Sequence, residues 1–162
     1  MFYKLFARPA LFHLSRYDPE IAHEWALHVL KKVGRKEVAR DALNRRTRVE
    51  DERLSQTLFG LRFPNPIGLA AGFDHNAEAV HGLAALGFGF LEVGTVTQHE
   101  QPGNDRPRIV RYPKERALIN RMGFPNVGAT MVRNRLMRLG RPERLPIGVS
   151  IGKSVVTPLD QA

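Results

Sequence analysis

Residues 63–76 constrain the fold more than any other stretch of the chain. They read Phe-Pro-Asn-Pro-Ile-Gly-Leu-Ala-Ala-Gly-Phe-Asp-His-Asn. Pro64 and Pro66 donate no backbone hydrogen bond, so they belong at the start or the edge of a strand. The apolar run 67–71 lacks polar alternation, which is typical of a strand buried on both faces in a helix-covered parallel sheet. We predict such a strand here, and a helix over 77–86.

The same stretch ends in a candidate binding site. Gly72 and the polar residues Asp74, His75 and Asn76 directly follow the predicted strand. Small residues at the carboxyl end of a strand let a flat ligand approach the backbone, and α/β proteins place their sites at that end. A tight strand-to-helix turn, with small residues for packing, explains the pattern equally well.

Two further segments repeat this plan. Residues 88–94 are typical of a second buried strand ending at Thr95-Val-Thr97, and 146–151 of a third ending at Gly152. A helix predicted over 127–139 lies between them and ends at Gly140. Shorter extended runs are predicted within 58–69 and 108–112. Strand–helix–strand units of this kind predict an α/β fold with a parallel sheet.

The amino-terminal part predicts two short amphipathic helices with basic residues. In the first 15 residues large apolar side chains alternate with Lys and Arg. Asp18-Pro19 predicts the start of a second helix, stopped by Gly34. Its apolar positions recur every four residues, at Ile21, Trp25, Val29 and Val33. Such helices suit an interfacial membrane anchor or a pair packed on the protein, and the residues alone slightly favour the packed pair. Residues 35–53 predict a charged linker with some helical character.

Composition limits the classes of function. The 162 residues, 43% apolar and 25% charged, suffice for one globular domain. The absence of cysteine excludes disulfides and thiolate chemistry, and we assign no metal ligand. No run reaches the ~20 apolar residues that span a bilayer, and no signal peptide is indicated. The net charge of +9 suits an anionic membrane surface or a phosphate-bearing ligand, and equally a basic surface that is only solvated. Without a nucleic-acid motif we expect no nucleic acid.

Five motifs follow one another in the order of a known family. They are Leu69-Ala-Ala-Gly-Phe-Asp74, Glu92-Val-Gly-Thr-Val-Thr97, Gln101-Pro-Gly-Asn-Asp-Arg-Pro-Arg108, Ile119-Asn-Arg-Met-Gly-Phe124 and Ile151-Gly-Lys153. Together with Asp18-Pro-Glu-Ile-Ala-His23 they closely resemble class 2 dihydroorotate dehydrogenase, the quinone-dependent, membrane-associated enzyme of pyrimidine synthesis. The resemblance covers essentially the whole chain. A soluble class 1 relative is the nearest alternative enzyme, and the amphipathic front end argues against it.

The resemblance implies an α/β fold in which a helical pair precedes a (β/α)8 TIM barrel with FMN at its carboxyl-end mouth. Residues 1–45 would form the helical membrane and quinone-tunnel domain with its linker, and 46–162 about three βα units of the barrel. The implied activity oxidises dihydroorotate to orotate through FMN and passes electrons to ubiquinone or menaquinone. The implied location is peripheral, on the cytoplasmic side of the cell membrane, or the mitochondrial inner membrane in a eukaryote.

The resemblance also implies site residues. Those for FMN are Ala70, Ala71, Gly72, Phe73, Asp74, His75, Thr95 and Ser150. Those for dihydroorotate are His75, Asn120, Arg121, Met122, Gly123 and Phe124. Those for the quinone are His23 and Arg111, although Arg111 alone is equally typical of an ordinary exposed arginine.

Two positions depart from the family's pattern. His75 stands where the family usually has a lysine, and Ser150 where it commonly has an asparagine. An unperturbed histidine is mostly neutral at pH 7 whereas a lysine is charged, yet either donates a hydrogen bond. The Ser150 hydroxyl keeps a donor and an acceptor but reaches less far than an amide.

The family's Asn-x-Ser-Ser-Pro-Asn segment, which supplies the catalytic serine base, has no counterpart in these residues, so we assign no catalytic residue. A barrel of this kind needs about 250 residues. We therefore expect a truncated chain that holds half an active site. Alone it should be poorly soluble or partly molten, and inactive on dihydroorotate. The alternative function is that of a non-catalytic membrane-binding fragment.

Overall fold

The computed structural model describes residues 5–6, 8–16, 18–140 and 145–161. Its α-helices are α1 (Arg8–Leu14), α2 (Pro19–Gly34), α3 (Glu37–Thr47), α4 (Val80–Ala84) and α5 (Ala129–Leu139). Its strands are β1 (Gln56–Leu58), β2 (Leu61–Phe63), β3 (Gly68–Leu69), β4 (Phe90–Thr97), β5 (Ile109–Tyr112), β6 (Ala117–Asn120) and β7 (Ile147–Gly152). Short 3₁₀ turns span Glu52–Leu54 and Leu159–Gln161.

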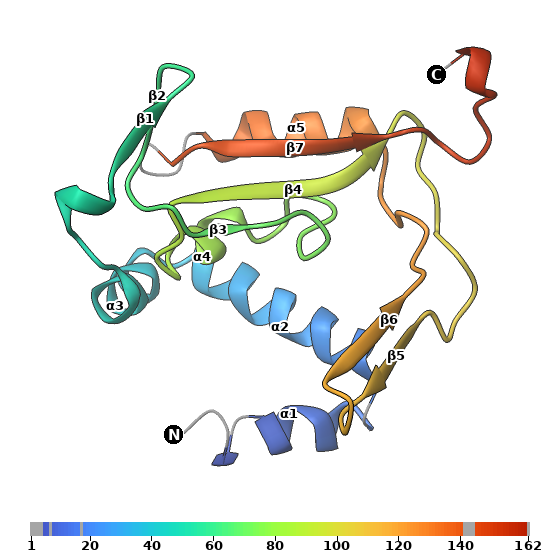
Figure 1. The fold of residues 1–162 in the computed structure, drawn as a ribbon, viewed down its shortest axis with the longest axis horizontal. Coiled ribbons are helices and arrows are strands. Elements are labelled where there is room, and N and C mark those ends of the chain that lie inside the picture. The colour runs from blue at the N-terminus through green and yellow to red at the C-terminus, as the bar shows by residue number, and fades with distance from the viewer. Residues whose placement is uncertain (1–4, 7, 17, 141–144, 162) are drawn as a thin grey trace.

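A three-stranded parallel sheet in the order β3-β4-β7 forms the centre of the molecule (Figure 1). Leu69 lies opposite Leu91, and Val93 lies opposite Val149. The strands predicted over 88–94 and 146–151 are confirmed, each shifted by one to three residues, and the helix predicted between them is α5. Because β3 leads through α4 to β4 in parallel, the α/β class is confirmed.

Helices α4 and α5 cover one face of this sheet. The core joins Val80 of α4 to Leu91 of β4 and to Val132 of α5. At the edges, Ile67 is 63% exposed and Ile151 is 82% exposed. The prediction that the first and third strands are buried on both faces is therefore wrong. In the described part of the chain, β3 and β7 each pair with one neighbour; both residues of β3 are half-buried, and three of the six residues of β7 are exposed.

The helix predicted over 77–86 is shorter than expected, because α4 begins only at Val80. The Asp74 carboxylate accepts the backbone N–H groups of Asn76, Glu78 and Ala79, at 3.3, 2.8 and 2.8 Å. These bonds hold residues 74–79 in a compact turn before the helix can start. Apolar periodicity alone does not report such a turn.

Helix α2 begins where predicted and packs directly on α4. The Asp18 carboxylate caps it by accepting from the amides of Glu20 and Ile21. A Cβ on Gly82 would lie 2.0 Å from the Leu30 carbonyl oxygen, so the two helix backbones touch. Gly34 is the last residue of α2, and it is buried against Gly82. Its role is therefore close packing in addition to the predicted helix stop.

The predicted single apolar face of α2 is divided in two. Leu27 and Leu30 pack on the core, whereas Trp25 is 45% exposed and Val29 is 58% exposed. None of the side chains of α1 is buried. Residues 1–4 of the predicted amphipathic segment lie outside the described residues. Among the residues that are described, no helix is long and apolar enough to cross a membrane.

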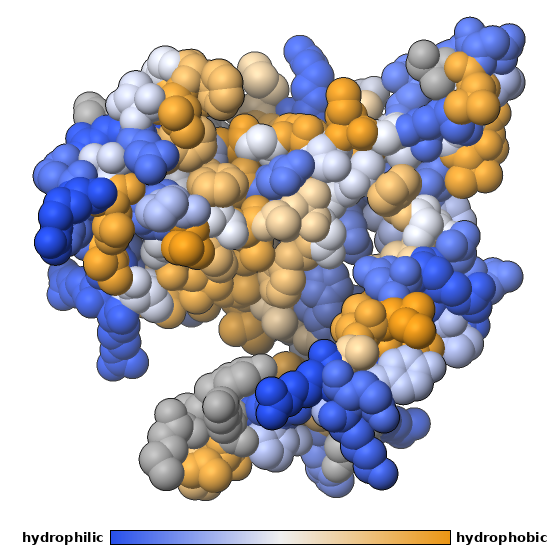
Figure 2. Space-filling view, in the orientation of Figure 1, coloured by the Kyte–Doolittle hydropathy of each residue, from blue (hydrophilic) through white to orange (hydrophobic). Residues whose placement is uncertain are grey.

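Two antiparallel hairpins flank the sheet. β1 pairs with β2, and β5 pairs with β6 beside α1 and α2 (Figure 1). Figure 2 shows apolar side chains over the β5–β6 hairpin and on the segment after β7; among the exposed ones are Val110, Leu118, Ile119, Val155, Val156 and Leu159. The linker predicted over 35–53 contains the eleven-residue helix α3, as its partly helical character indicated.

Candidate functional site

Helix α2 meets the loop after β3 through His23. Its Nε2 donates to the Phe73 carbonyl oxygen at 2.7 Å. The His23 ring lies edge-on to the rings of Phe73 and His75, with centroids 4.9 and 5.9 Å away. Residues predicted to serve a quinone and a flavin are thus neighbours. With Nε2–H used in this bond, a neutral His23 offers only an acceptor, Nδ1, to any ligand.

His75 lies in a setting that disfavours its charged form. Burial lowers the pKa of the His75 imidazole below its ordinary 6.5, and the nearby His23 and Arg108 lower it further. The carboxylates of Asp74 and Glu20 act in the opposite direction without cancelling the shift. His75 is therefore a neutral hydrogen-bonding side chain at pH 7, unlike the lysine usual at this position.

We expect this shift to make stability pH-dependent. Below pH 6.5 the unfolded His75 takes up a proton that the folded one resists, so the unfolded state binds more protons and stability falls as the pH drops. Urea titrations between pH 7.5 and 5 should show a shallower pH dependence for His75→Asn than for the unsubstituted protein. The exposed Gln98 provides the control, since Gln98→Asn removes no titratable group and should keep the original slope. Equal slopes for all three proteins would contradict the prediction.

The loop 70–74 runs beside the middle of β4. The Gly72 amide donates to the Gly94 carbonyl oxygen at 2.9 Å, and the Gly94 amide donates to the Asp74 carbonyl oxygen at 3.0 Å. Gly72 has φ +103°, and a Cβ there would meet no atom within 4 Å. Ala70 and Gly72 are exposed, while the Asp74 side chain is fully buried in its own turn. The backbone of 70–73 can therefore accept a flat ligand, and the Asp74 carboxylate supports the loop from behind.

Thr95 and Ser150 form a hydroxyl pair on adjacent strands. Their Oγ atoms lie 2.9 Å apart, at the irregularity in the pairing of β4 with β7. Gly152 follows on β7, where an added Cβ would lie 2.8 Å from the Thr95 methyl group and 3.6 Å from the Phe124 ring. Three predicted site residues, Thr95, Ser150 and Phe124, are therefore gathered around the carboxyl ends of β4 and β7.

The segment 120–124 is held by a hydrogen bond within the segment and by hydrogen bonds to residues 101–108. The Asn120 side-chain oxygen accepts the Met122 N–H at 2.8 Å. Met122 is buried and lines a hollow of about 460 Å³ that also contains His23, His75 and Arg108. Arg121 and Phe124 are exposed. The structure thus brings Met122 close to His75 and His23, while Asn120 stays at the exposed end of β6.

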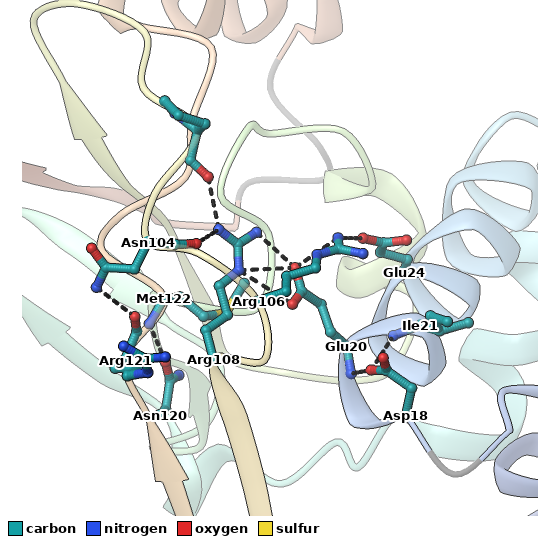
Figure 3. A network of polar contacts seen from close by, with 11 residues as sticks. Asp18, Glu20, Ile21, Glu24, Asn104, Arg106, Arg108, Asn120, Arg121 and Met122 are labelled. Atoms are coloured by element: carbon teal, nitrogen blue, oxygen red, sulfur yellow. Dashed lines mark hydrogen bonds and ion pairs between the residues drawn. The ribbon is translucent and has the colours of Figure 1, made fainter.

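The residues that line the hollow include a buried ion pair between Glu20 of α2 and Arg108, and Figure 3 shows its contacts. Arg108 is 8% exposed and Glu20 is 4% exposed, and Arg108 Nη2 donates to Glu20 Oε1 at 2.7 Å. Arg106 bridges Glu20 to the exposed Glu24. Burial raises the pKa of Glu20, but hydrogen bonds and charge from Arg108 and Arg106 outweigh burial and hold it below 4.5.

Arg111 occupies a different place from the other predicted residues. Its guanidinium carbon lies 4.3 Å from the centroid of the Phe12 ring of α1. This cation–π contact joins the β5–β6 hairpin to the first helix. Arg111 is thus partly covered and specifically placed between the hairpin and α1.

A sequence model described as Dihydroorotate dehydrogenase matches residues 53–160. The chain belongs to the dihydroorotate dehydrogenase family. A relative named dihydroorotate dehydrogenase (quinone) from Chloroflexus aurantiacus is 53% identical over the whole chain, and one from Acidithiobacillus ferrooxidans is 50% identical over 96% of it. The chain spans 44% and 42% of their lengths, less than half of each.

Solved structures of the dihydroorotate dehydrogenase of Eimeria tenella have the same fold over most of the chain. The ferulenol complex is 40% identical, with a TM-score of 0.72 over 89% of this chain and 39% of that one. The ligand-free form is 41% identical, with a TM-score of 0.73 over 87% and 39%.

Three polar residues of the site were missed by the sequence-based assignment of dehydrogenase roles. Glu20 and Arg108 lie inside the motifs but received no role of their own. The third, Asn126, is buried and ties the end of β4 to the segment 120–124: its Nδ2 donates to Thr97 Oγ1 at 2.8 Å and to the Phe124 carbonyl oxygen at 2.9 Å. The only signal for it in the sequence was the turn-like run 125–128.

Proposed function

We propose that this chain forms the flavin- and substrate-binding first part of a quinone-dependent dihydroorotate dehydrogenase. The observation that carries the proposal is the meeting of His23, His75 and Met122 around one hollow. These residues come from three distant parts of the sequence, and the family resemblance assigns them to the quinone, to flavin and substrate, and to the substrate. Their meeting is what transfer of electrons from dihydroorotate to a quinone requires.

The residues present fit FMN. The exposed backbone of 70–73, with open space at Gly72, suits close approach of a flat ring, and the Thr95 and Ser150 hydroxyls lie at the neighbouring strand ends. When bound, FMN would accept hydride from the substrate and pass the electrons on to the quinone. The Asp74 carboxylate would keep the loop in the shape that accepts the ring.

The substrate would lie between His75 and the segment 120–124. The Asn120 side-chain oxygen is engaged by Met122, so its Nδ2 remains to donate to a pyrimidine carbonyl. Neutral His75 would donate one hydrogen bond without supplying a charge. A carbonyl oxygen of the quinone would need a hydrogen-bond donor. Arg111 would provide one, whereas His23 would provide one from Nδ1 only when its imidazole is protonated.

We further propose the division of the chain and its location. Residues 1–45 would form the helical quinone domain, and 46–162 the first three βα units of a (β/α)8 barrel, supported by the parallel β3-β4-β7 sheet. The exposed Trp25 and Val29, together with Leu5, Phe6 and Leu14, would face the membrane surface. The enzyme would then act as a peripheral protein on the cytoplasmic side.

The test is dihydroorotate-dependent reduction of a soluble quinone by the protein in its longest natural form. We expect turnover, and a KM for dihydroorotate about tenfold higher in Asn120→Ala, since one hydrogen bond to the substrate is lost. Asn134→Ala, at an exposed position of α5, should keep the original KM. Absence of dihydroorotate oxidation in a folded, flavin-loaded protein would refute the proposed function.

A further inference from the structure

One face of α2 reaches two separate loops. Glu20 and His23 lie one turn apart on the helix, so their side chains point the same way. His23 holds the loop after β3 through the Phe73 carbonyl oxygen at 2.7 Å. Glu20 holds Arg108, which lies 88 positions later in the chain. The helix therefore touches both the proposed flavin loop and the segment that leads into the proposed substrate segment.

Arg108 divides its donors between the helix and the loop 102–104 (Figure 3). Nε and Nη2 contact the Glu20 carboxylate, at 3.1 Å and 2.7 Å from Oε1. Nη1 donates to the carbonyl oxygens of Pro102 and Asn104, at 2.7 and 2.9 Å. Because the guanidinium is rigid and planar, fixing it on Glu20 also fixes these two carbonyl groups.

The loop 102–104 in turn forms hydrogen bonds with the proposed substrate segment 120–124. The Asn104 side-chain amide donates to the Arg121 carbonyl oxygen at 2.7 Å, and the Asn104 backbone amide donates to the Met122 carbonyl oxygen at 2.8 Å. The Arg121 amide donates to the Arg108 carbonyl oxygen at 2.8 Å. A Cβ on Gly103 would lie 2.2 Å from the Met122 carbonyl oxygen, so the two stretches of chain have no room to slide.

We propose that Glu20 is a positioning residue for the substrate site. Through Arg108 and Asn104 it fixes residues 121–123, while His23 on the same face of α2 fixes the loop that carries His75. The spacing between His75 and Met122 across the hollow is then set by α2. The amino-terminal helix pair is on this account a structural part of the substrate site as well as an attachment to the membrane. The inference rests on the proposed function for the identity of the substrate.

The experiment compares Glu20→Gln with Glu24→Gln. Both carboxylates bind Arg106, but only Glu20 is buried and contacts Arg108, so Glu24→Gln is a matched control. Glu20→Gln leaves the buried Arg108 without its counter-ion. Hydrogen exchange at the amides of Asn104 and Arg121 should become about tenfold faster in Glu20→Gln and remain unchanged in Glu24→Gln.

Steady-state kinetics then separate positioning from general loss of structure. In Glu20→Gln the KM for dihydroorotate should rise about tenfold while the KM for the quinone stays the same. Loss of folded protein would lower kcat and leave both KM values unchanged. If Glu20→Gln does not fold, Glu20→Asp keeps the charge on a shorter side chain. It should then raise the KM for dihydroorotate by a smaller factor and again leave the KM for the quinone unchanged.

Equal exchange rates in the Glu20 and Glu24 variants would overturn the inference, as would faster exchange with an unchanged KM for dihydroorotate. If the unsubstituted protein does not oxidise dihydroorotate, the proposed function fails by itself. The exchange comparison then still decides whether Glu20 holds residues 121–123.

Discussion

Gly82→Ala should lower the free energy of unfolding by about 2 kcal/mol or more, although alanine favours helix. In a helix interior, alanine is more favourable than glycine by about 1 kcal/mol. The added Cβ would lie 2.0 Å from the Leu30 carbonyl oxygen and 2.7 Å from its carbon, both backbone atoms of α2. No side-chain rotation relieves such a contact, and overpacking costs about 1–3 kcal/mol or more. Helix α2 must move away from α4 as a unit.

The measurement is urea denaturation of Gly82→Ala beside Gly148→Ala. Gly148 lies on the exposed part of β7, where a Cβ would come no closer than 3.5 Å to the Glu92 side chain. This control should stay within about 0.5 kcal/mol of the unsubstituted protein. A Gly82→Ala protein as stable as the control would contradict the close crossing of α2 and α4, and with it the role of α2 in the site.

Asp74→Ala should be at least as damaging, with a loss of about 3 kcal/mol, because hydrogen bonds to a charged group contribute about 1.5–3 kcal/mol each and unsatisfied buried donors cost about 1–3 kcal/mol. The carboxylate is fully buried and accepts three backbone N–H groups, two of them at 2.8 Å. The turn 74–79 should open, and the neighbouring loop 70–73 should lose the shape that we propose binds flavin.

Denaturation and flavin content check this prediction together. Asp41→Ala, at an exposed position of α3, removes a carboxylate without removing a turn and should change neither quantity appreciably. An Asp74→Ala protein of normal stability and flavin content would show that the turn 74–79 holds its shape without the carboxylate.

The sequence predicts correctly those helices and strands that are determined by neighbouring residues. Asp18-Pro19 predicted the start of α2, because an aspartate cap and a proline at the first helical position act on adjacent residues. The apolar runs predicted β4 and β7 for the same reason. The turn before α4 was missed because Asp74 was assigned to a ligand, whereas its oxygens bind the amides of the following residues.

Long-range features could not be predicted from the sequence. How far each strand is buried depends on which helices cover the sheet. The apolar runs of β3 and β7 contain no information about that packing. Glu20 is flanked by Pro19 and Ile21, and Arg108 by Pro107 and Ile109. Neither local context indicates that the charge is buried or which residue it pairs with. Only the fold, which brings α2 against the start of β5, makes them a buried pair. His75 was located by resemblance, but its lowered pKa depends on burial and on His23, a residue of α2.

The most direct test of the central claim is the visible spectrum of the purified protein, in its longest natural form, before and after anaerobic addition of dihydroorotate. The account predicts an oxidised-flavin spectrum that dihydroorotate bleaches and that a quinone restores. A folded protein without flavin, or one whose flavin is unchanged by dihydroorotate, would contradict the claim that the loop 70–75 and the segment 120–124 form one flavin and substrate site.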